Sequence, residues 1–255
     1  MRGAFAVLVV LADGCGRIRF DDLNRGDASG GRGGDASMIA GLIHWWKLDE
    51  APGATMMADS AGGANLTRDP GTATFVAGKL GNALLLPADG TENNSHVATP
   101  TDVLGQTALT LSYWNKRSSL EGAIGQDNGG TSNTRISIAP WDDGNVYFSI
   151  GSDTSDDDGY IVLTDTNWHL YTMVFDGTGV GNVGRLHGYL DGVEQTLTFQ
   201  GTIASHTTST ATTFQVGDGL SNQTSFSGYY DDIRIYDRAL TAAEVATLYS
   251  TTGGT

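Results

Sequence analysis

The sequence is poor in the residues that form disulfides, basic surfaces and long helices. Its 255 residues include one cysteine, five prolines and only three lysines. A single cysteine excludes a disulfide within the chain, so the fold has to be stable without that cross-link. Aspartate outnumbers glutamate by 24 to 5, and glutamate and lysine are among the better helix formers, so a mainly helical protein is disfavoured.

The shortage of basic residues also limits the classes of partner. Fourteen Lys and Arg are set against 29 Asp and Glu, which gives a formal net charge of −15 and a pI near 4.4. Nucleic acids and anionic membrane surfaces are bound through basic patches, so neither is an expected partner. Carboxylate oxygens bind hard cations, so the composition favours a protein that holds calcium.

An apolar run near the N-terminus is too short to cross a membrane. Residues 4–12 are apolar, follow the single charge of Arg2, and have the length of the hydrophobic region of a secretory signal. The only cysteine, Cys15, lies three residues beyond this run. The segment resembles a bacterial lipoprotein signal, which implies cleavage before Cys15 and lipidation of that residue, although Asp13 departs from the pattern. A plain secretory signal and an unprocessed start are the alternatives.

Composition then divides the chain. We predict a signal peptide over residues 1–14, a flexible Gly-rich linker over 15–38, one domain over 39–251 and a short tail over 252–255. The linker is polar and has no apolar periodicity, so it cannot bury a core and is expected to act as a tether. The signal implies a protein outside the cytoplasm, anchored by lipid to the cell envelope or otherwise secreted.

Short alternating runs of apolar and polar residues, separated by turn residues, fill the chain from Ile39 onward. Residues 142–145 (DDGN) separate two such runs and predict a hairpin, and Asp191 with Gly192 predicts a second, tight one. Thr241 and Glu244 form a capping-box pattern at the start of the one predicted helix. The absence of alternating strand and helix patterns favours an all-β, antiparallel jelly-roll sandwich with one short C-terminal helix.

Several segments together carry a family resemblance. In chain order they are GLIHWWKLDE (41–50) with ADSAG (58–62), GKLGNAL (78–84), LTLSYW (109–114), WHLYTMVFDG (168–177), YLDG (189–192) and GYYDDIRIYDRALT (228–241). They resemble LamG-like jelly-roll domains of the concanavalin A-like lectin and glucanase superfamily. The resemblance implies the fold but leaves the function open, because this superfamily includes binding modules, hydrolases and structural modules.

Asp231 is the most informative carboxylate of the sequence. Period-2 alternation places it on the same face as Ile233 and Ile235, so it points inward if the isoleucines do, and a buried charge needs a partner. The resemblance implies a structural calcium ion here, with Asp59 as a second contributor and backbone carbonyls completing the shell. The alternative is that Asp231 caps backbone amides or pairs with an arginine.

A catalytic pair of the glucanase type is not found. Glucanases of this superfamily carry Glu-x-Asp-x-x-Glu on one strand, and none of the five glutamates has that spacing. We therefore expect a protein that is not an enzyme, namely an extracytoplasmic recognition module for carbohydrate or a surface protein. The alternatives are a glycan-active enzyme of unrecognised type on the same scaffold and a structural or adhesion component.

The candidate ligand contacts lie around the predicted 142–145 hairpin. Sugar sites combine an aromatic face, which stacks on the sugar ring, with a few polar groups that orient it. Trp141 is at the hairpin tip beside Asp143, and Tyr160 follows an acidic run. These three residues are the predicted ligand-binding residues.

Overall fold

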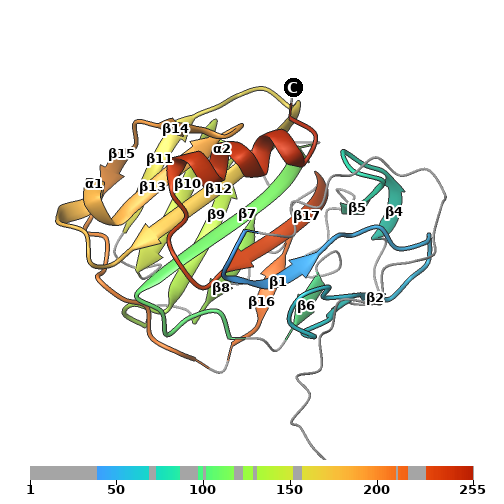
Figure 1. Ribbon diagram of the computed structural model, residues 1–255, viewed down its shortest axis with the longest axis horizontal. Coiled ribbons are helices and arrows are strands. Elements are labelled where there is room, and N and C mark those ends of the chain that lie inside the picture. Colours follow the sequence, from blue (N-terminus) through green and yellow to red (C-terminus); the bar gives the residue numbers. More distant parts are fainter. Residues whose placement is uncertain are drawn as a thin grey trace, which may run out of the picture. The chain divides into compact units, whose positions relative to one another are not determined.

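The computed structural model describes residues 39–68, 73–86, 97–99, 102–117, 123–128, 131–151, 157–210, 212–217 and 228–254. The predicted signal, the linker and Cys15 therefore lie outside the described residues. Within these ranges the chain forms two antiparallel β-sheets and two helices (Figure 1). The all-β prediction is confirmed.

The first sheet, sheet A, has the strand order β14-β13-β12-β7-β17-β5-β4, with β1 added beside β17. Every pairing in it is antiparallel. Its strands are β1 (Leu42–Trp46), β4 (Thr74–Ala77), β5 (Asn82–Leu86), β7 (Ala108–Arg117), β12 (Trp168–Asp176), β13 (Leu186–Leu190), β14 (Val193–Gln195) and β17 (Gly228–Tyr236).

The second sheet, sheet B, has the order β15-β11-β10-β9-β8-β16-β6-β3-β2. Its strands are β2 (Met56–Met57), β3 (Leu66–Arg68), β6 (Val97–Thr99), β8 (Ile124–Asp127), β9 (Arg135–Pro140), β10 (Asn145–Gly151), β11 (Asp158–Val162), β15 (Thr198–Gln200) and β16 (Phe214–Val216). Alternate residues of both sheets, such as Leu111 and Phe148, are buried in one apolar cluster. The core therefore lies between the two sheets, as in a β-sandwich.

A second, smaller apolar cluster lies on the other face of sheet A. The helix α2 (Ala242–Thr251) packs Val245 and Leu248 there against Trp114 of β7 (Figure 1). Its predicted capping box is confirmed, because Thr241 and Glu244 exchange both side-chain-to-backbone hydrogen bonds. None of the described helices is long and apolar enough to span a membrane.

The helix α1 (Gly181–Arg185) was not predicted. It is five residues long, contains two glycines, which are poor helix formers, and buries no residue. Both predicted hairpins are present: residues 141–144 connect β9 to β10, which begins at Asn145, and β13 turns into β14 at Asp191 and Gly192. These two residues have φ values of 52° and 78°, as a type I′ turn requires.

A β-bulge in β17 corrects one prediction. The register of β17 against β7 shifts between Asp231 and Arg234, and Asp232 adopts a left-handed φ of 49°. Tyr230 and Ile233 consequently both face the main core, whereas Asp231 opposes Trp114 on the outer side of sheet A. The predicted inward direction of Asp231 is therefore wrong, because the alternation was read without the extra residue.

Asp59 ties β1 to the loop that follows it. Its side chain is fully buried, and its two oxygens accept five hydrogen bonds of 2.7–3.0 Å. Oδ1 accepts from the backbone N–H groups of Trp45, Ala61 and Gly62. Oδ2 accepts from the backbone N–H of Ala64 and from His44 Nδ1. Burial alone would raise the pKa of Asp59, but the hydrogen bonds from Gly62, His44 and Trp45 lower it to about 2. The ionised carboxylate is therefore the form that this loop stabilises.

This predicts a defined acid sensitivity. The pKa of Asp59 is lower in the folded chain than its ordinary value of 3.8, so its contribution is complete above that value and is lost as the pH falls towards 2. Asp59→Asn should lower the free energy of unfolding by about 2 kcal/mol near neutral pH and by much less near pH 2. Urea denaturation over this pH range measures both values.

Asp142→Asn, which changes an exposed carboxylate, is the matched control and should leave the free energy of unfolding nearly unchanged at each pH. A destabilisation by Asp59→Asn that stayed constant down to pH 2 would contradict the assigned role of the ionised carboxylate.

Candidate ligand-binding site on the outer face of sheet B

The outer face of sheet B, turned away from the core, carries a strip of aromatic side chains. Val146 and Phe148 of β10 point into the core, so Tyr147 between them points outward. Tyr147 lies directly opposite Tyr160 of β11, and their ring centroids are 5.5 Å apart. Both tyrosines are partly exposed.

Trp141 extends this strip towards β9 and β8. Its partly buried ring packs against Ala123 and Ala139, apart from the main core, and Ala139 lies opposite Tyr147 in the register of β9 and β10. We call Trp141, Tyr147 and Tyr160 the aromatic strip. The structure thus brings together the two predicted aromatic residues and adds Tyr147 between them.

Asp143 fixes the position of Tyr147. The Tyr147 hydroxyl donates to Asp143 Oδ2 at 2.6 Å, and Asn145 donates from its backbone N–H to Oδ1 and from Nδ2 to Oδ2 at 2.8 and 2.7 Å. Partial desolvation opposes ionisation, but the hydrogen bonds from Tyr147 and Asn145 prevail and lower the pKa of Asp143. The third predicted ligand residue is therefore an exposed, ionised carboxylate at one end of the strip.

A row of polar residues runs beside the aromatic strip. Ser149 of β10 lies opposite Ser137 of β9 on one side and opposite Asp158 of β11 on the other. All three are buried, and the hydroxyl oxygens of Ser137 and Ser149 have no hydrogen-bond partner. These three side chains are too buried to reach a ligand, so the accessible polar groups beside the strip are those of Asp143 and Asn145.

Tyr147, Ser137 and Ser149 were missed by the sequence analysis. Alternation within residues 146–150 already separates Tyr147 and Ser149 from the apolar residues on either side of them. That signal places both on the outer face, but only the register between strands shows that they lie beside Tyr160 and Ser137.

The two predicted calcium ligands have different surroundings. Asp231 is fully buried, and its Oδ2 accepts hydrogen bonds from the N–H groups of Lys79 and Leu80, both at 2.8 Å, whereas its Oδ1 has no partner. Burial raises the pKa of Asp231 to about 8. Both oxygens of Asp59 already accept hydrogen bonds, so Asp59 has no unused oxygen of the kind that Asp231 could offer to a cation.

Among the described residues, no group of three or more His, Cys, Asp or Glu side chains is arranged to hold a metal ion. In the neighbouring Asp232, Oδ1 accepts from Trp45 Nε1 at 2.6 Å and from Arg234 Nη2 at 3.1 Å, whereas Oδ2 is buried and has no partner. The shared calcium site of Asp59 and Asp231 stays a prediction.

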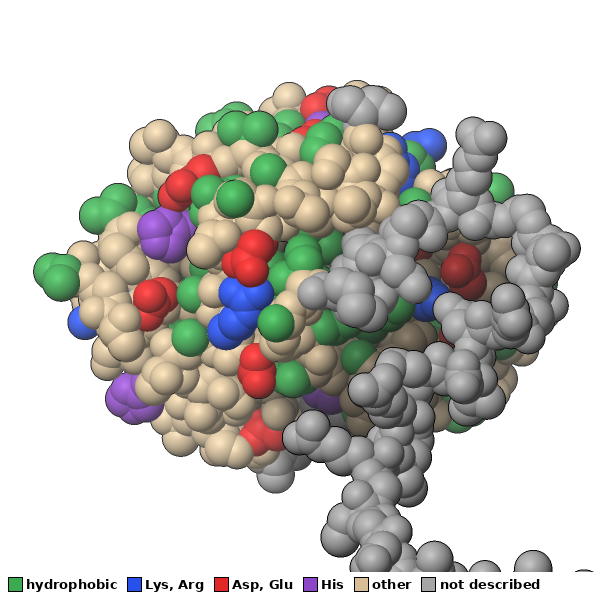
Figure 2. Space-filling model, viewed as in Figure 1, with side chains coloured by type: hydrophobic (Ala, Val, Ile, Leu, Met, Phe, Trp, Pro, Cys, Tyr) green, Lys and Arg blue, Asp and Glu red, His purple; other side chains and the backbone are tan. Residues whose placement is uncertain are grey.

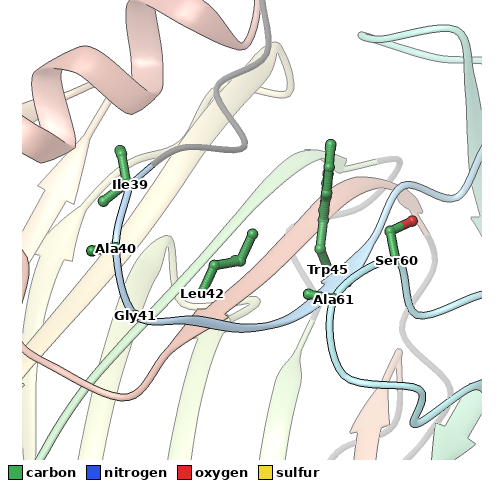
Figure 3. Close-up of a pocket in the computed structure, with 7 residues that line it drawn as sticks. All are labelled: Ile39, Ala40, Gly41, Leu42, Trp45, Ser60 and Ala61. Carbon is green, nitrogen blue, oxygen red and sulfur yellow. The ribbon is translucent and has the colours of Figure 1, made fainter. Parts of the chain in front are cut away.

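A pocket of about 390 Å³ lies on the outer side of sheet A (Figure 3). None of the predicted site residues lines it, but Asp59 is adjacent and accepts hydrogen bonds from the backbone N–H groups of two lining residues, Trp45 and Ala61. Trp45 and Leu42 rise from β1 into it, and Ser60 and Ala61 lie next to Trp45. The indole of Trp45 is held by its bond to Asp232 and by the Arg234 guanidinium, 4.5 Å from the ring centroid. None of the described residues that line the pocket has an ionisable side chain.

Several solved structures have a similar fold. One is domain 4 of AbnA, a GH43 extracellular arabinanase from Geobacillus stearothermophilus, which was determined in complex with arabinotriose. It is 24% identical to this chain and has a TM-score of 0.58, and the match covers 82% of this chain and 98% of that chain. The binding domain of botulinum neurotoxin DC, in complex with rat synaptotagmin II, is 14% identical with a TM-score of 0.59. There the match covers 83% of this chain and 52% of the toxin domain.

A third similar structure is that of botulinum neurotoxin type C, whose cell entry depends on interaction with two ganglioside molecules. It is 12% identical with a TM-score of 0.61, and 85% of this chain and 52% of that chain are covered. These likenesses concern the fold, and this chain spans about half the length of the toxin domains it matches.

No curated protein matches the sequence. A family model described as concanavalin A-like lectin/glucanases superfamily matches residues 89–246, which is more than half of the chain. This match agrees with the jelly-roll resemblance of the sequence and with the antiparallel sandwich of the structure. The chain therefore belongs to the concanavalin A-like lectin/glucanase superfamily.

Proposed function

We propose that this protein is a non-catalytic recognition module outside the cytoplasm that binds a glycan on the outer face of sheet B. The observation that carries the proposal is the aromatic strip, in which the partly exposed rings of Tyr147 and Tyr160 pack together across β10 and β11 and the partly exposed Trp141 packs on Ala139, the residue opposite Tyr147. The apolar faces of a sugar stack on such rings, and its hydroxyls need hydrogen-bond partners close by. Asp143 and Asn145 supply those partners at one end of the strip.

The charge of this face favours neutral over acidic glycans. Asp142 and Asp143 are exposed beside Trp141, and the whole chain carries a formal charge of −15. Figure 2 shows carboxylates spread over the opposite side of the molecule as well, with few basic groups. A sialic acid or uronate would be repelled by this field, whereas a neutral sugar would not.

Ligand binding should therefore depend on the aromatic strip. We expect Trp141→Ala and Tyr160→Ala each to weaken glycan binding by about tenfold or more, the effect of losing a main contact worth about 1.4 kcal/mol. A glycan array with the purified protein finds the ligand, and calorimetry with the strongest neutral hit then measures the dissociation constants. Neutral glycans should bind and their sialylated or uronate forms should not.

Tyr229→Ala is the matched control, because Tyr229 is also a partly exposed aromatic residue but lies on sheet A, edge-on to Trp168. It should leave the dissociation constant unchanged, and the melting temperatures of all variants show whether each one is folded. Unchanged binding in folded Trp141→Ala and Tyr160→Ala would contradict the placement of the site. Silence of the whole array would favour a protein ligand or a structural role instead.

The proposal that the module is not an enzyme rests on the surroundings of the carboxylates. An enzyme would need two carboxylates that face one cleft, with one of them held protonated near neutral pH. Asp231 is the described carboxylate with a strongly raised pKa, but it is entirely buried under Lys79 and Leu80. Asp143 is exposed, and its pKa is lowered.

Calcium is a separate part of the proposal. Asp231 Oδ1 is a buried carboxylate oxygen that has no hydrogen-bond partner. A calcium ion would bind such an oxygen, and its positive charge would balance the buried carboxylate. Asp231 would hold the ion and backbone carbonyls would complete its shell. The ion's role would be structural, because Asp231 lies on sheet A and the aromatic strip lies on sheet B.

Calcium should accordingly stabilise the fold through Asp231. We expect the melting temperature to rise by several degrees when millimolar calcium replaces a chelator, and we expect Asp231→Asn to abolish that difference. Differential scanning fluorimetry measures both. Asp143→Asn, which changes an exposed carboxylate on sheet B, should keep the full calcium effect. Equal melting temperatures of the unaltered protein in calcium and in chelator would refute this part of the proposal.

A further inference from the structure

One end of the sandwich core contains a group of buried polar residues. Three tyrosines, an asparagine and an arginine lie on the inner face of sheet A, namely Tyr113, Asn115 and Arg117 of β7, Tyr171 of β12 and Tyr230 of β17. The exposed fraction of Arg117 is 2% and that of the other four is 0%. We call these five residues the tyrosine–arginine cluster.

Strand pairing holds the cluster together. Tyr113 lies directly opposite Tyr171, and Asn115 lies directly opposite Tyr230. The ring centroid of Tyr113 is 5.6 Å from that of Tyr171 and 6.1 Å from that of Tyr230. The three phenol rings therefore form one group across β12, β7 and β17, with Tyr113 in the middle.

The hydrogen-bonding groups of this cluster are largely unused. The hydroxyl oxygens of all three tyrosines, Nη1 of Arg117 and Oδ1 of Asn115 are buried and have no partner. A buried polar group without a hydrogen bond costs about 1–3 kcal/mol, so the four unused donors, namely the three hydroxyls and Arg117 Nη1, are expected to share a bound species, whereas Asn115 Oδ1 can only accept.

Arg117 determines which species fits. Its Nη2 donates to the backbone oxygens of Leu163 and Asp165 at 2.7 and 2.8 Å, and both of these partners are neutral carbonyl groups. Within the described residues, no ion pair involves Arg117. Arginine keeps its charge in proteins, and a buried charge is stable only when it is paired.

The tyrosines remain hydrogen-bond donors. Burial raises the pKa of Tyr113, Tyr171 and Tyr230 well above the ordinary value, so none of them becomes the anion that would pair with Arg117. The positive charge of Arg117 acts in the opposite direction on Tyr113 and Tyr171 but is the weaker effect.

The nearest carboxylates are bound to another group. His169 lies beside Tyr171, with their ring centroids 6.2 Å apart. Its Nδ1 contacts Asp191 Oδ2 at 2.7 Å and its Nε2 contacts Asp165 Oδ1 at 2.9 Å. Both carboxylates are partly exposed at the rim and are directed at His169. These two carboxylates weaken the positive potential around Arg117, but neither accepts a hydrogen bond from Arg117 Nη1.

We propose that the tyrosine–arginine cluster is a buried binding site for a small monovalent anion, with chloride as the model ligand. Arg117 Nη1 and the three phenol hydroxyls supply up to four donors, which suits a species that only accepts hydrogen bonds. The site is separate from the proposed glycan site, because it lies between the sheets on the side of sheet A. Its effect is to stabilise this end of the sandwich.

Replacing chloride by a large anion tests the proposal. We expect the melting temperature of the full chain to rise with sodium chloride and to level off, relative to sodium gluconate at the same ionic strength, because gluconate is too large to enter. Tyr113→Phe and Tyr230→Phe each remove one unused hydroxyl and keep the ring. Both variants should fold, and each should weaken the apparent chloride affinity by about tenfold, the loss expected for one hydrogen bond to a charged group.

Tyr189→Phe is the matched control. Tyr189 is also buried, but it belongs to the apolar cluster on the outer side of sheet A, so its chloride dependence should equal that of the unaltered protein. Crystals grown in bromide should show an anomalous peak within hydrogen-bond distance of Arg117 Nη1. Equal melting temperatures in chloride and gluconate, full chloride dependence in both cluster variants, or water alone at Arg117 would each overturn the proposal.

Discussion

The extra residue in β17 is the constraint on which most of sheet A depends. This strand pairs with β7, β5 and β1, so any change in its alternation alters three neighbours together. The bulge keeps Tyr230 and Ile233 in the same core while it turns both Asp231 and Asp232 outward. Two carboxylates are thereby buried next to each other, and the surrounding chain has to accommodate their charge.

The surroundings accommodate the two carboxylates in different ways. Asp232 is neutralised by Arg234 and accepts from Trp45, so it links β17 to β1. Asp231 receives only backbone N–H groups, from Lys79 and Leu80, and this approach requires a residue without a side chain just before them. A Cβ atom on Gly78 would lie 2.6 Å from Asp231 Oδ2, so Gly78 is needed for the loop to reach the carboxylate.

The parts of the fold that the sequence predicted are those governed by local rules. The β9–β10 hairpin, the Asp191–Gly192 turn and the Thr241–Glu244 capping box each depend on residues that are neighbours in the chain. The direction of Asp231 depends instead on a bulge, which changes no residue type and leaves no signal in alternation. The helix α1 was missed because its glycines oppose helix formation.

The candidate site was predicted only in part, because its single residues follow from local patterns whereas their contacts follow from the pairing of strands. Trp141, Asp143 and Tyr160 were chosen as single residues near one hairpin, and the structure places all three around Tyr147. Tyr147 itself could be assigned to the outer face from alternation, but its contact with Tyr160 depends on the register of β10 and β11. The tyrosine–arginine cluster joins three strands far apart in the sequence, so no local pattern indicates it.

The position of the aromatic strip on paired strands has a consequence for affinity. A binding site on a loop loses conformational freedom when a ligand orders it, and that loss subtracts from the binding free energy. Here the hydroxyl of Tyr147 is already bonded to Asp143, and its ring is already packed on Tyr160. The same carboxylate that holds the ring also places a negative charge at the end of the strip. In the proposed glycan site, Asp143 therefore supplies both the hydrogen bond that holds the Tyr147 ring and the negative charge that opposes acidic ligands.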